Sequence, residues 1–422
     1  MKINISKFVM FVLIVMANSM AFSQNRNVVW VHGFGDDSSA WEHYATIFSN
    51  ERKINSTRQS YPTANGLTTA ANALRNTVPD AASTNLGIGH SLGGLMIREV
   101  DRVPGAGGNK FGGYITLATP NYGAPVATSV LSGNVQSAIS TAISQLVAGP
   151  LSEMPAFGLP WIILPGASEY TTDWVANQLA KLINITTNAT YTDMQTGSAA
   201  MDNLLHFSST ANRIAIVAEE TSPVHWRLLG SMMNRGQSNG QPNDENLLAI
   251  MNQIREVYNS LYINHQALAI GLGDMIPFLG FHSNAAAQWK KGQDWMDNSE
   301  TIWCSLIKTT GTVKMHITDL VWQPCLPLPN SPFLPSPDCG TWLQVDTYDY
   351  VTQSTKSDGL LPTYAQELQD IPAGNRYLID HANHIELLDM SYSKNQNGTL
   401  DDGTKVTLNA IFNRNDWFNT PK

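Results

Sequence analysis

The sequence predicts an α/β fold whose mainly parallel sheet is covered by helices on both faces, and three observations favour this class. Short apolar runs alternate with segments of helical periodicity between residues 27 and 118, the element order typical of parallel sheets. A serine flanked by glycines stands between a strand-like and a helix-like run, at residues 89–93. The chain has 422 residues, 43% of them hydrophobic, which suits one large domain with insertions better than two independent domains.

Residues 27–31 are expected to form the first strand of the sheet. An apolar stripe at helical spacing then predicts a helix over residues 38–48, capped by Ser38 or Ser39, because serine side chains accept from the first free N–H groups of a helix. A second helix is expected over residues 64–78. It leads into the strand before the serine, so the elements keep the order of a parallel sheet.

The segment that organises the chain runs from a strand at residues 85–88, through Ser91, into a helix at residues 92–100. A strand that turns abruptly into a helix at a serine is a nucleophile elbow. Its turn is so tight that a Cβ at Gly89 or Gly93 would collide with the neighbouring strand or helix. The hydroxyl of Ser91 is thereby exposed at the head of the helix.

Upstream, the first strand runs into His32-Gly33-Phe34-Gly35, a turn that can aim a backbone N–H at a developing oxyanion. With the elbow, this turn resembles the secreted lipase and esterase branch of the α/β-hydrolase superfamily. The resemblance extends over residues 24–125, 210–220 and 355–390. It implies an α/β-hydrolase fold, Ser91 as the nucleophile, and an oxyanion hole formed by the N–H groups of Phe34 and Leu92.

A serine nucleophile needs a histidine base and a carboxylate that orients it, and in this fold the acid and the histidine follow the serine in that order. Asp358 lies on a glycine turn, and His384 follows the last predicted strand; both segments look like their lipase counterparts. They are the predicted acid and base. His381 is closer to the strand and is expected to be structural. Rival acids are Glu219, Glu220, Asp346 and Asp349.

Two further histidines, His32 and His90, lie inside the motifs and are expected to shape the oxyanion turn and the elbow by hydrogen bonding. Some secreted bacterial lipases hold a structural calcium near the base. Here Glu386 stands where that pattern has an aspartate, so calcium is not indicated. No cofactor and no catalytic metal are expected.

The regular alternation stops twice, which predicts cap or lid insertions at about residues 126–209 and 221–345, both helical or irregular. The first contains an apolar, proline-punctuated run at residues 146–166 and an amphipathic helix around residues 174–182. A moving cover at a lipid surface and simple packing onto the core are both open readings of these apolar residues.

The second insertion contains apolar residues at helical spacing over residues 247–261, which predicts an amphipathic helix. The glycine-rich, apolar residues 267–281 are expected to form a loop over or beside the substrate cleft.

Residues 1–23 have the features of a secretory signal peptide: two lysines, a short apolar run, and small residues before Gln24. The alternative, a membrane anchor, requires a longer unbroken apolar run. The protein is therefore expected to be secreted or periplasmic, with residues 24–422 forming the hydrolase domain. A net charge of −9 without any basic run speaks against nucleic-acid binding.

The chain has three cysteines, all in one late region. Cys325 and Cys339 flank a proline-rich loop and are the preferred disulfide pair in an oxidising compartment, which leaves Cys304 over. A zinc site is not supported, because no paired cysteine or histidine spacing accompanies them.

These expectations combine into a secreted serine ester hydrolase, a lipase that cleaves acylglycerols or other apolar carboxylic esters at a lipid–water interface. Alternatives on the same triad are a phospholipase, a lipid deacylase and a polyester depolymerase. A noncatalytic binding protein is a further alternative, against which the intact serine, acid and histidine speak. The sequence leaves open the acyl chain length, interfacial activation, the lid, protein partners and the oligomeric state.

Overall fold

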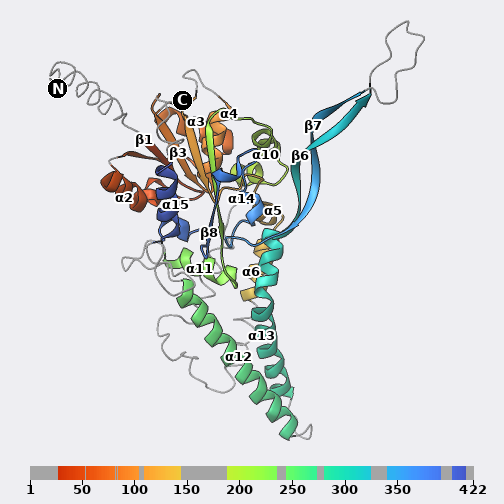
Figure 1. The fold of residues 1–422 in the computed structure, drawn as a ribbon. Coiled ribbons are helices and arrows are strands. Elements are labelled where there is room, and N and C mark those ends of the chain that lie inside the picture. The colour runs from red at the N-terminus through yellow and green to blue at the C-terminus, as the bar shows by residue number, and fades with distance from the viewer. Residues whose placement is uncertain are drawn as a thin grey trace, which may run out of the picture.

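The computed structural model describes residues 27–52, 54–80, 82, 84–103, 109–143, 188–234, 244–272, 280–324, 340–390 and 402–414. Several sequence predictions fall outside these ranges: the signal peptide, the apolar run at 146–166, the helix at 174–182, and both Cys325 and Cys339. Figure 1 shows a sheet domain from which a helical hairpin and a β-ribbon project in different directions.

The sheet has six strands in the order β2-β1-β3-β4-β5-β8, and every neighbouring pair is parallel. This arrangement, with helices on both faces, confirms the predicted α/β-hydrolase fold class. The strands are β1 (Asn27–Val31), β2 (Asn55–Gln59), β3 (Asn85–His90), β4 (Gly113–Leu117), β5 (Asn212–Glu219) and β8 (Arg376–Asp380).

Alternate residues of the strands pack into two separate cores, because successive side chains of a strand point to opposite faces. Val28 and Trp30 of β1 join a core with helices α2 (Glu42–Arg52) and α15 (Gly403–Phe412). Val29 and Val31 face the other side, toward helices α3 (Leu67–Thr77) and α4 (Leu92–Arg102). Both faces of the sheet are therefore buried (Figure 1).

Sequence reasoning missed strand β2, and it misplaced one helix cap. The β2 sequence, NSTRQ, is polar throughout and half exposed, as an edge strand allows, so it carries no hydrophobic pattern. A short 3₁₀ turn, η1 (Ser38–Trp41), precedes α2, and its cap is Asp37 rather than Ser38 or Ser39. The Asp37 carboxylate accepts from the Ser39 N–H at 2.7 Å, which a carboxylate at a cap position does at least as well as a hydroxyl.

Both predicted insertions contain helices. Between β4 and β5 these are α5 (Pro125–Leu131), α6 (Asn134–Ile143), α9 (Ala189–Met194) and α10 (Ala199–Leu205). Between β5 and β8 come α11 (Val224–Asn234), α12 (Asp244–Leu272), α13 (Gly280–Ile307) and α14 (Thr363–Gln366). Two short 3₁₀ turns complete the described elements, η3 (Ala373–Asn375) and η4 (Glu386–Leu388). Among the described helices, none is long and apolar enough to span a bilayer.

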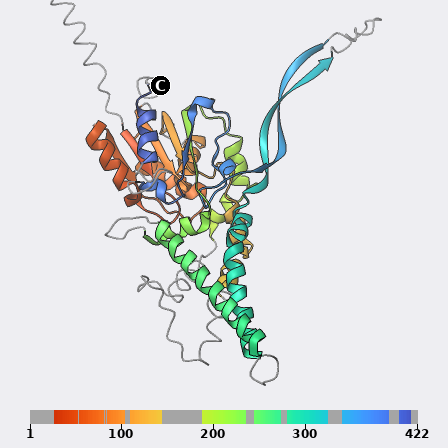
Figure 2. The same ribbon diagram turned by 60° about the horizontal axis from the view of Figure 1, so that its bottom comes forward.

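Helices α12 and α13 form a long antiparallel hairpin, which corrects the predicted loop at residues 267–272 and 280–281; residues 273–279 of that prediction lie outside the described residues. Residues up to Leu272 belong to α12, and α13 begins at Gly280. These two helix ends lie at the tip of the hairpin that is remote from the sheet, as both views show (Figure 1 and Figure 2). Gly271 and Gly280 therefore belong to helices remote from the sheet rather than to a loop beside the cleft.

A two-stranded antiparallel ribbon, β6 (Thr310–Pro324) and β7 (Gly340–Ser354), follows the hairpin. It projects away from the sheet domain on the side opposite α2 (Figure 1). Sequence reasoning did not predict the ribbon or helix α13. In the chain, the ribbon connects α13 to the turn that carries Asp358.

Candidate active site

Ser91 lies at the junction between β3 and α4, in a conformation that non-glycine residues rarely adopt. Its φ of 54° and ψ of −125° are a strained combination of the kind that clusters at functional sites. A Cβ at Gly89 would lie 2.5 Å from the Gly93 carbonyl carbon, and a Cβ at Gly93 would overlap the Val31 carbonyl oxygen. The elbow therefore requires glycine at both positions because the helix and the neighbouring strand approach so closely.

Asp358 and His384 meet although they are separated by 26 residues in the chain. The Asp358 Oδ2 and His384 Nδ1 atoms are 2.7 Å apart, and the two side chains are 0% and 3% exposed. The other carboxylate oxygen, Oδ1, accepts from the N–H groups of Leu360 at 2.9 Å and Leu361 at 2.7 Å. A carboxylate that only accepts requires Nδ1 to donate, which leaves the His384 Nε2 lone pair available.

The backbone of His384 is held on both sides by groups of the same site. Its N–H donates to the Asp358 carbonyl at 2.8 Å, and its carbonyl lies 2.9 Å from His90 Nε2. His90 ends β3, directly before Ser91, and its ring is 4.6 Å from the His384 ring between centroids. His90 thus links the strand before Ser91, the predicted nucleophile, to the loop of His384, the predicted base. It has the hydrogen-bonding role expected from the sequence.

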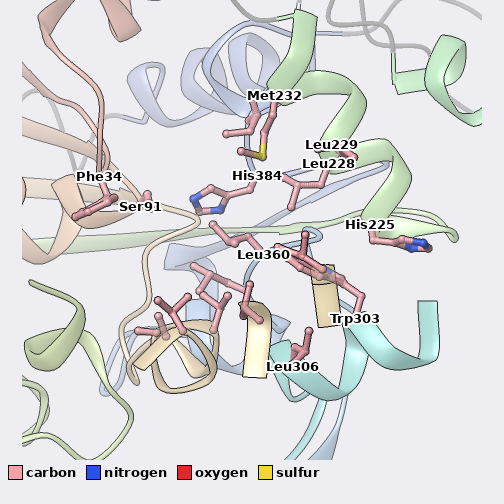
Figure 3. Close-up of a pocket in the computed structure, with 18 of the residues that line it drawn as sticks. Phe34, Ser91, His225, Leu228, Leu229, Met232, Trp303, Leu306, Leu360 and His384 are labelled. Atoms are coloured by element: carbon pink, nitrogen blue, oxygen red, sulfur yellow. The ribbon is translucent and has the colours of Figure 1, made fainter. Parts of the chain in front are cut away.

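Ser91 and His384 face the same cavity, which has a volume of about 290 Å³ and an almost entirely apolar wall (Figure 3). Both insertions supply this wall, through α5 and α6 from the first and α11 and α13 from the second. Typical members of each helix are Val130, Ile139, Leu229 and Leu306. A small-molecule site of this form accepts an apolar group and presents one polar end to the serine.

Phe34 and Leu92, the predicted oxyanion donors, come from two different segments, the turn after β1 and the start of α4. Phe34 lines the cavity in the turn after β1, and its ring packs 4.9 Å from the ring of Tyr191. Leu92 is the first residue of α4, so its N–H is one of those that have no acceptor within the helix. The Ser91 N–H is used elsewhere, since it donates to the Leu117 carbonyl at 2.9 Å.

The structure brings none of the four rival acids onto the His384 ring. Glu219 forms an ion pair with Lys356, at 3.1 Å, and Glu220 accepts from the N–H of Thr221 at 2.6 Å. Asp346 and Asp349 belong to β7, where their backbones pair with Thr318 and Met315 of β6, on the projecting ribbon (Figure 1).

His381 contacts the carboxylate of Asp380, whereas His384 contacts that of Asp358. It lies in a left-handed conformation with a φ of 58°, and its Nε2 is 3.4 Å from the Asp380 carboxylate. Its place is at the end of β8, as expected for a structural residue.

Asn383, directly before the predicted base, has a buried hydrogen-bond network that sequence reasoning did not identify. Its Oδ1 accepts from the N–H groups of Ile385 and Glu386, at 3.2 and 3.1 Å. Its Nδ2 donates to Ser231 Oγ at 2.9 Å and to Glu386 Oε2 at 3.0 Å, and Glu220 Oε2 lies at 3.4 Å. The only signal in the sequence was an asparagine next to the histidine, and its partners are distant in the chain.

His225 is a partly buried histidine on the cavity wall, and the desolvation of its ring lowers its pKa to about 3. Its Nε2 is 2.7 Å from Ser299 Oγ, whose hydroxyl donates to the Met296 carbonyl at 2.7 Å. Nε2 must therefore be the donor to Ser299. Nδ1 is buried, and no described residue hydrogen-bonds to it. A proton added at Nδ1 would lack an acceptor, which explains why the neutral ring is favoured.

The described part of the chain contains no group of three histidine, cysteine or acidic side chains arranged to hold a metal ion. Glu386, at the position considered for calcium, uses its carboxylate on Asn383. Cys304 carries a free thiol, and burial raises its pKa.

No protein-family model matches the sequence, and no curated protein matches it significantly. Solved structures of α/β-hydrolases do match. The mature Bacillus licheniformis lipase BlEst2 is 15% identical with a TM-score of 0.31, over 47% of this chain and 68% of the lipase. An extracellular α/β-hydrolase from a Paenibacillus species is 12% identical with a TM-score of 0.27, over 44% and 76%. Polyneuridine aldehyde esterase is 16% identical with a TM-score of 0.20, over 24% and 44%. Similarity at this level carries no inference about activity, substrate or secretion.

Proposed function

We propose that this protein is a serine ester hydrolase, a lipase or esterase that cleaves carboxylic esters with apolar acyl groups. One observation carries the proposal. A fully buried Asp358–His384 hydrogen bond of 2.7 Å lies at the head of an apolar cavity onto which the strained Ser91 also opens. Ester hydrolysis needs this combination, because a serine is a weak nucleophile until an oriented histidine takes its proton.

In the proposed mechanism, His384 Nε2 takes the proton of Ser91 Oγ as the oxygen attacks the ester carbonyl carbon. Asp358 keeps Nδ1 protonated and stabilises the imidazolium. The N–H groups of Phe34 and Leu92 bind the oxyanion, and loss of one such donor costs about a hundred- to a thousandfold in rate. His384 then protonates the departing alcohol. Water, activated by the same imidazole, releases the acid from the acyl-enzyme.

The wall of the cavity supports apolar acyl groups as the part of the substrate that binds. Both insertions contribute side chains to it, among them Val126, Ala138, Leu229 and Ile302. Burial of acyl methylenes against such a wall contributes roughly 0.8 kcal/mol each. We further propose that the protein acts outside the cytoplasm, on the basis of the signal-peptide pattern in residues 1–23. It requires no cofactor in this mechanism.

The proposal is tested with a series of p-nitrophenyl esters from acetate to decanoate, using the purified protein and its Ser91→Ala variant. We expect hydrolysis that rises with acyl length, and a loss of at least about 10³-fold in kcat in the variant. A preference for short chains would favour an esterase over a lipase. Activity that survives Ser91→Ala, or folded wild-type protein without activity on any ester, would sink the proposal.

A further inference from the structure

Helix α11 is part of the cavity wall, and it also contacts the loop that carries the base. Leu228, Leu229 and Met232 line the cavity, and Figure 3 shows all three beside His384. On the same turn, Ser231 Oγ accepts a hydrogen bond from Asn383 Nδ2 at 2.9 Å. One helical turn thus contacts the space for the substrate and the residue before the base.

The same helix packs against the turn that holds the acid. Gly359 follows Asp358 with a φ of 87°, and a Cβ placed on it would lie 3.0 Å from Leu228 Cβ. No larger residue fits between the turn and α11 without a shift. A displacement of α11 would therefore reach both the Asp358 turn and the His384 loop.

The hydrogen bonds of Asn383 link α11 to the backbone turn that contains His384. Its Oδ1 accepts from Ile385 N and Glu386 N, so its side chain closes the turn in which His384 lies. Asn383 and Ser231 are both 0% exposed, and water cannot replace their hydrogen bond. A buried, satisfied network of this kind fixes one arrangement of the groups that it joins.

Met232 lines the cavity and is 42% exposed, so part of its apolar side chain is accessible to a bound acyl chain. An acyl chain that covers Met232 removes apolar surface from water, and it therefore favours the position of α11 in which Met232 contacts the chain.

Taking the proposed ester hydrolysis as its premise, we propose that the Ser231–Asn383 hydrogen bond couples occupancy of the cavity to the placement of His384. An acyl chain long enough to pack on Leu228, Leu229 and Met232 fixes α11, and α11 holds Asn383 and with it the base. Asn383 is a positioning residue in this scheme. Longer acyl chains then raise kcat in addition to lowering KM.

The test measures kcat and KM separately for p-nitrophenyl acetate, butyrate, octanoate and decanoate with wild type and Ser231→Ala. We expect the variant to lose about tenfold in kcat on octanoate and decanoate, the size of effect expected for one buried hydrogen bond. On acetate, which does not reach α11, kcat should stay within about twofold. A role confined to stability would not produce this dependence on chain length.

Ser129→Ala is the matched control. Ser129 is also a buried serine in a cavity-wall helix, and its Oγ donates to the Leu306 carbonyl at 2.6 Å, so its hydroxyl joins α5 to α13. This substitution should leave the ratio of decanoate to acetate kcat unchanged. Ser231→Cys, which keeps the volume but is a weak acceptor, replaces Ser231→Ala if the alanine variant does not fold.

Asn383→Ala supplies the second arm of the test. It should lower kcat for every ester, because the turn around His384 loses its closure, and adding Ser231→Ala to it should cause no further change. Equal losses on acetate and decanoate in Ser231→Ala, no loss at all, or the same pattern in Ser129→Ala would overturn the coupling. Wild-type protein without ester hydrolysis would instead refute the premise.

Discussion

Asp358 and Glu220 both lie close to the loop that carries His384, and only Asp358 contacts the imidazole. Glu220 directly follows strand β5, and from the sequence it was a credible acid. Its carboxylate instead lies near Asn383, at 3.4 Å, and accepts from Thr221. The two carboxylates therefore have separable roles at the scale of single residues, one toward the ring and one toward the loop.

Asp358→Asn should lower kcat about 10³- to 10⁴-fold, because the amide does not hold His384 in the tautomer with Nε2 free. Glu220→Gln should cost less than about tenfold, since its partners include the neutral Thr221 N–H and hydroxyl and the Asn383 amide rather than the imidazole. Steady-state kinetics on one soluble ester compares the two variants at unchanged volume. A larger loss in Glu220→Gln than in Asp358→Asn would make Glu220 the acid.

Single residues were predictable where local sequence dictates their geometry. The elbow glycines and Ser91 follow from the steric demands of one tight turn, and these demands can be read from five consecutive residues. Asn383 was not predictable, because its partner Ser231 is 152 residues away. A polar network of this kind exists only after the chain has folded.

At the scale of elements, the packing of α11 on α13 depends on a neutral His225. Burial lowers the pKa of His225 to about 3, below its ordinary value in the unfolded chain. Its contribution to stability is therefore complete above about pH 6.5 and is lost as the pH falls toward 3, with a slope of up to about 1.4 kcal/mol per pH unit. We expect acid to loosen these two helices, which line the cavity.

His225→Gln should flatten the dependence of the unfolding midpoint on pH between 6.5 and 4, measured by urea denaturation.

His43 should change stability with pH in the opposite direction. Asp402, together with Asp389, raises the pKa of His43, so its contribution is present below about pH 6.5 and is lost as the pH rises through the raised pKa. His43→Gln should therefore destabilise the protein more at pH 5 than at pH 8. If the unfolding midpoint depended on pH in the same way in both variants, the opposite pKa shifts of His225 and His43 would be contradicted.

The elements of the sheet were largely predictable, and those of the second insertion were not. Strands β1, β3, β4 and β5 are apolar runs whose two faces are both buried, so hydrophobicity marks them. Polar β2 has no such mark. Glycines suggested that a loop begins at residue 267, but α12 continues to Leu272; an isolated glycine lowers helix propensity without excluding a helix.

At the scale of the whole molecule, the two insertions come together over one edge of the sheet and form one cavity. Helices α5 and α13 contribute Val130 and Leu306, which are 176 positions apart in the sequence, to the same wall. Sequence patterns could show that each insertion was apolar. They could not show that the insertions face each other, because that contact depends on how the hairpin and the sheet pack.

The central claim is that the folded molecule activates a single serine, and covalent labelling tests it most directly. The purified protein is treated with a fluorophosphonate, and the intact mass and the modified peptide are determined. We predict one adduct per chain, located on Ser91, with a rate that falls at least about 10³-fold in His384→Ala. A folded protein that takes up no label, or that is labelled at another residue with Ser91 intact, would contradict the account.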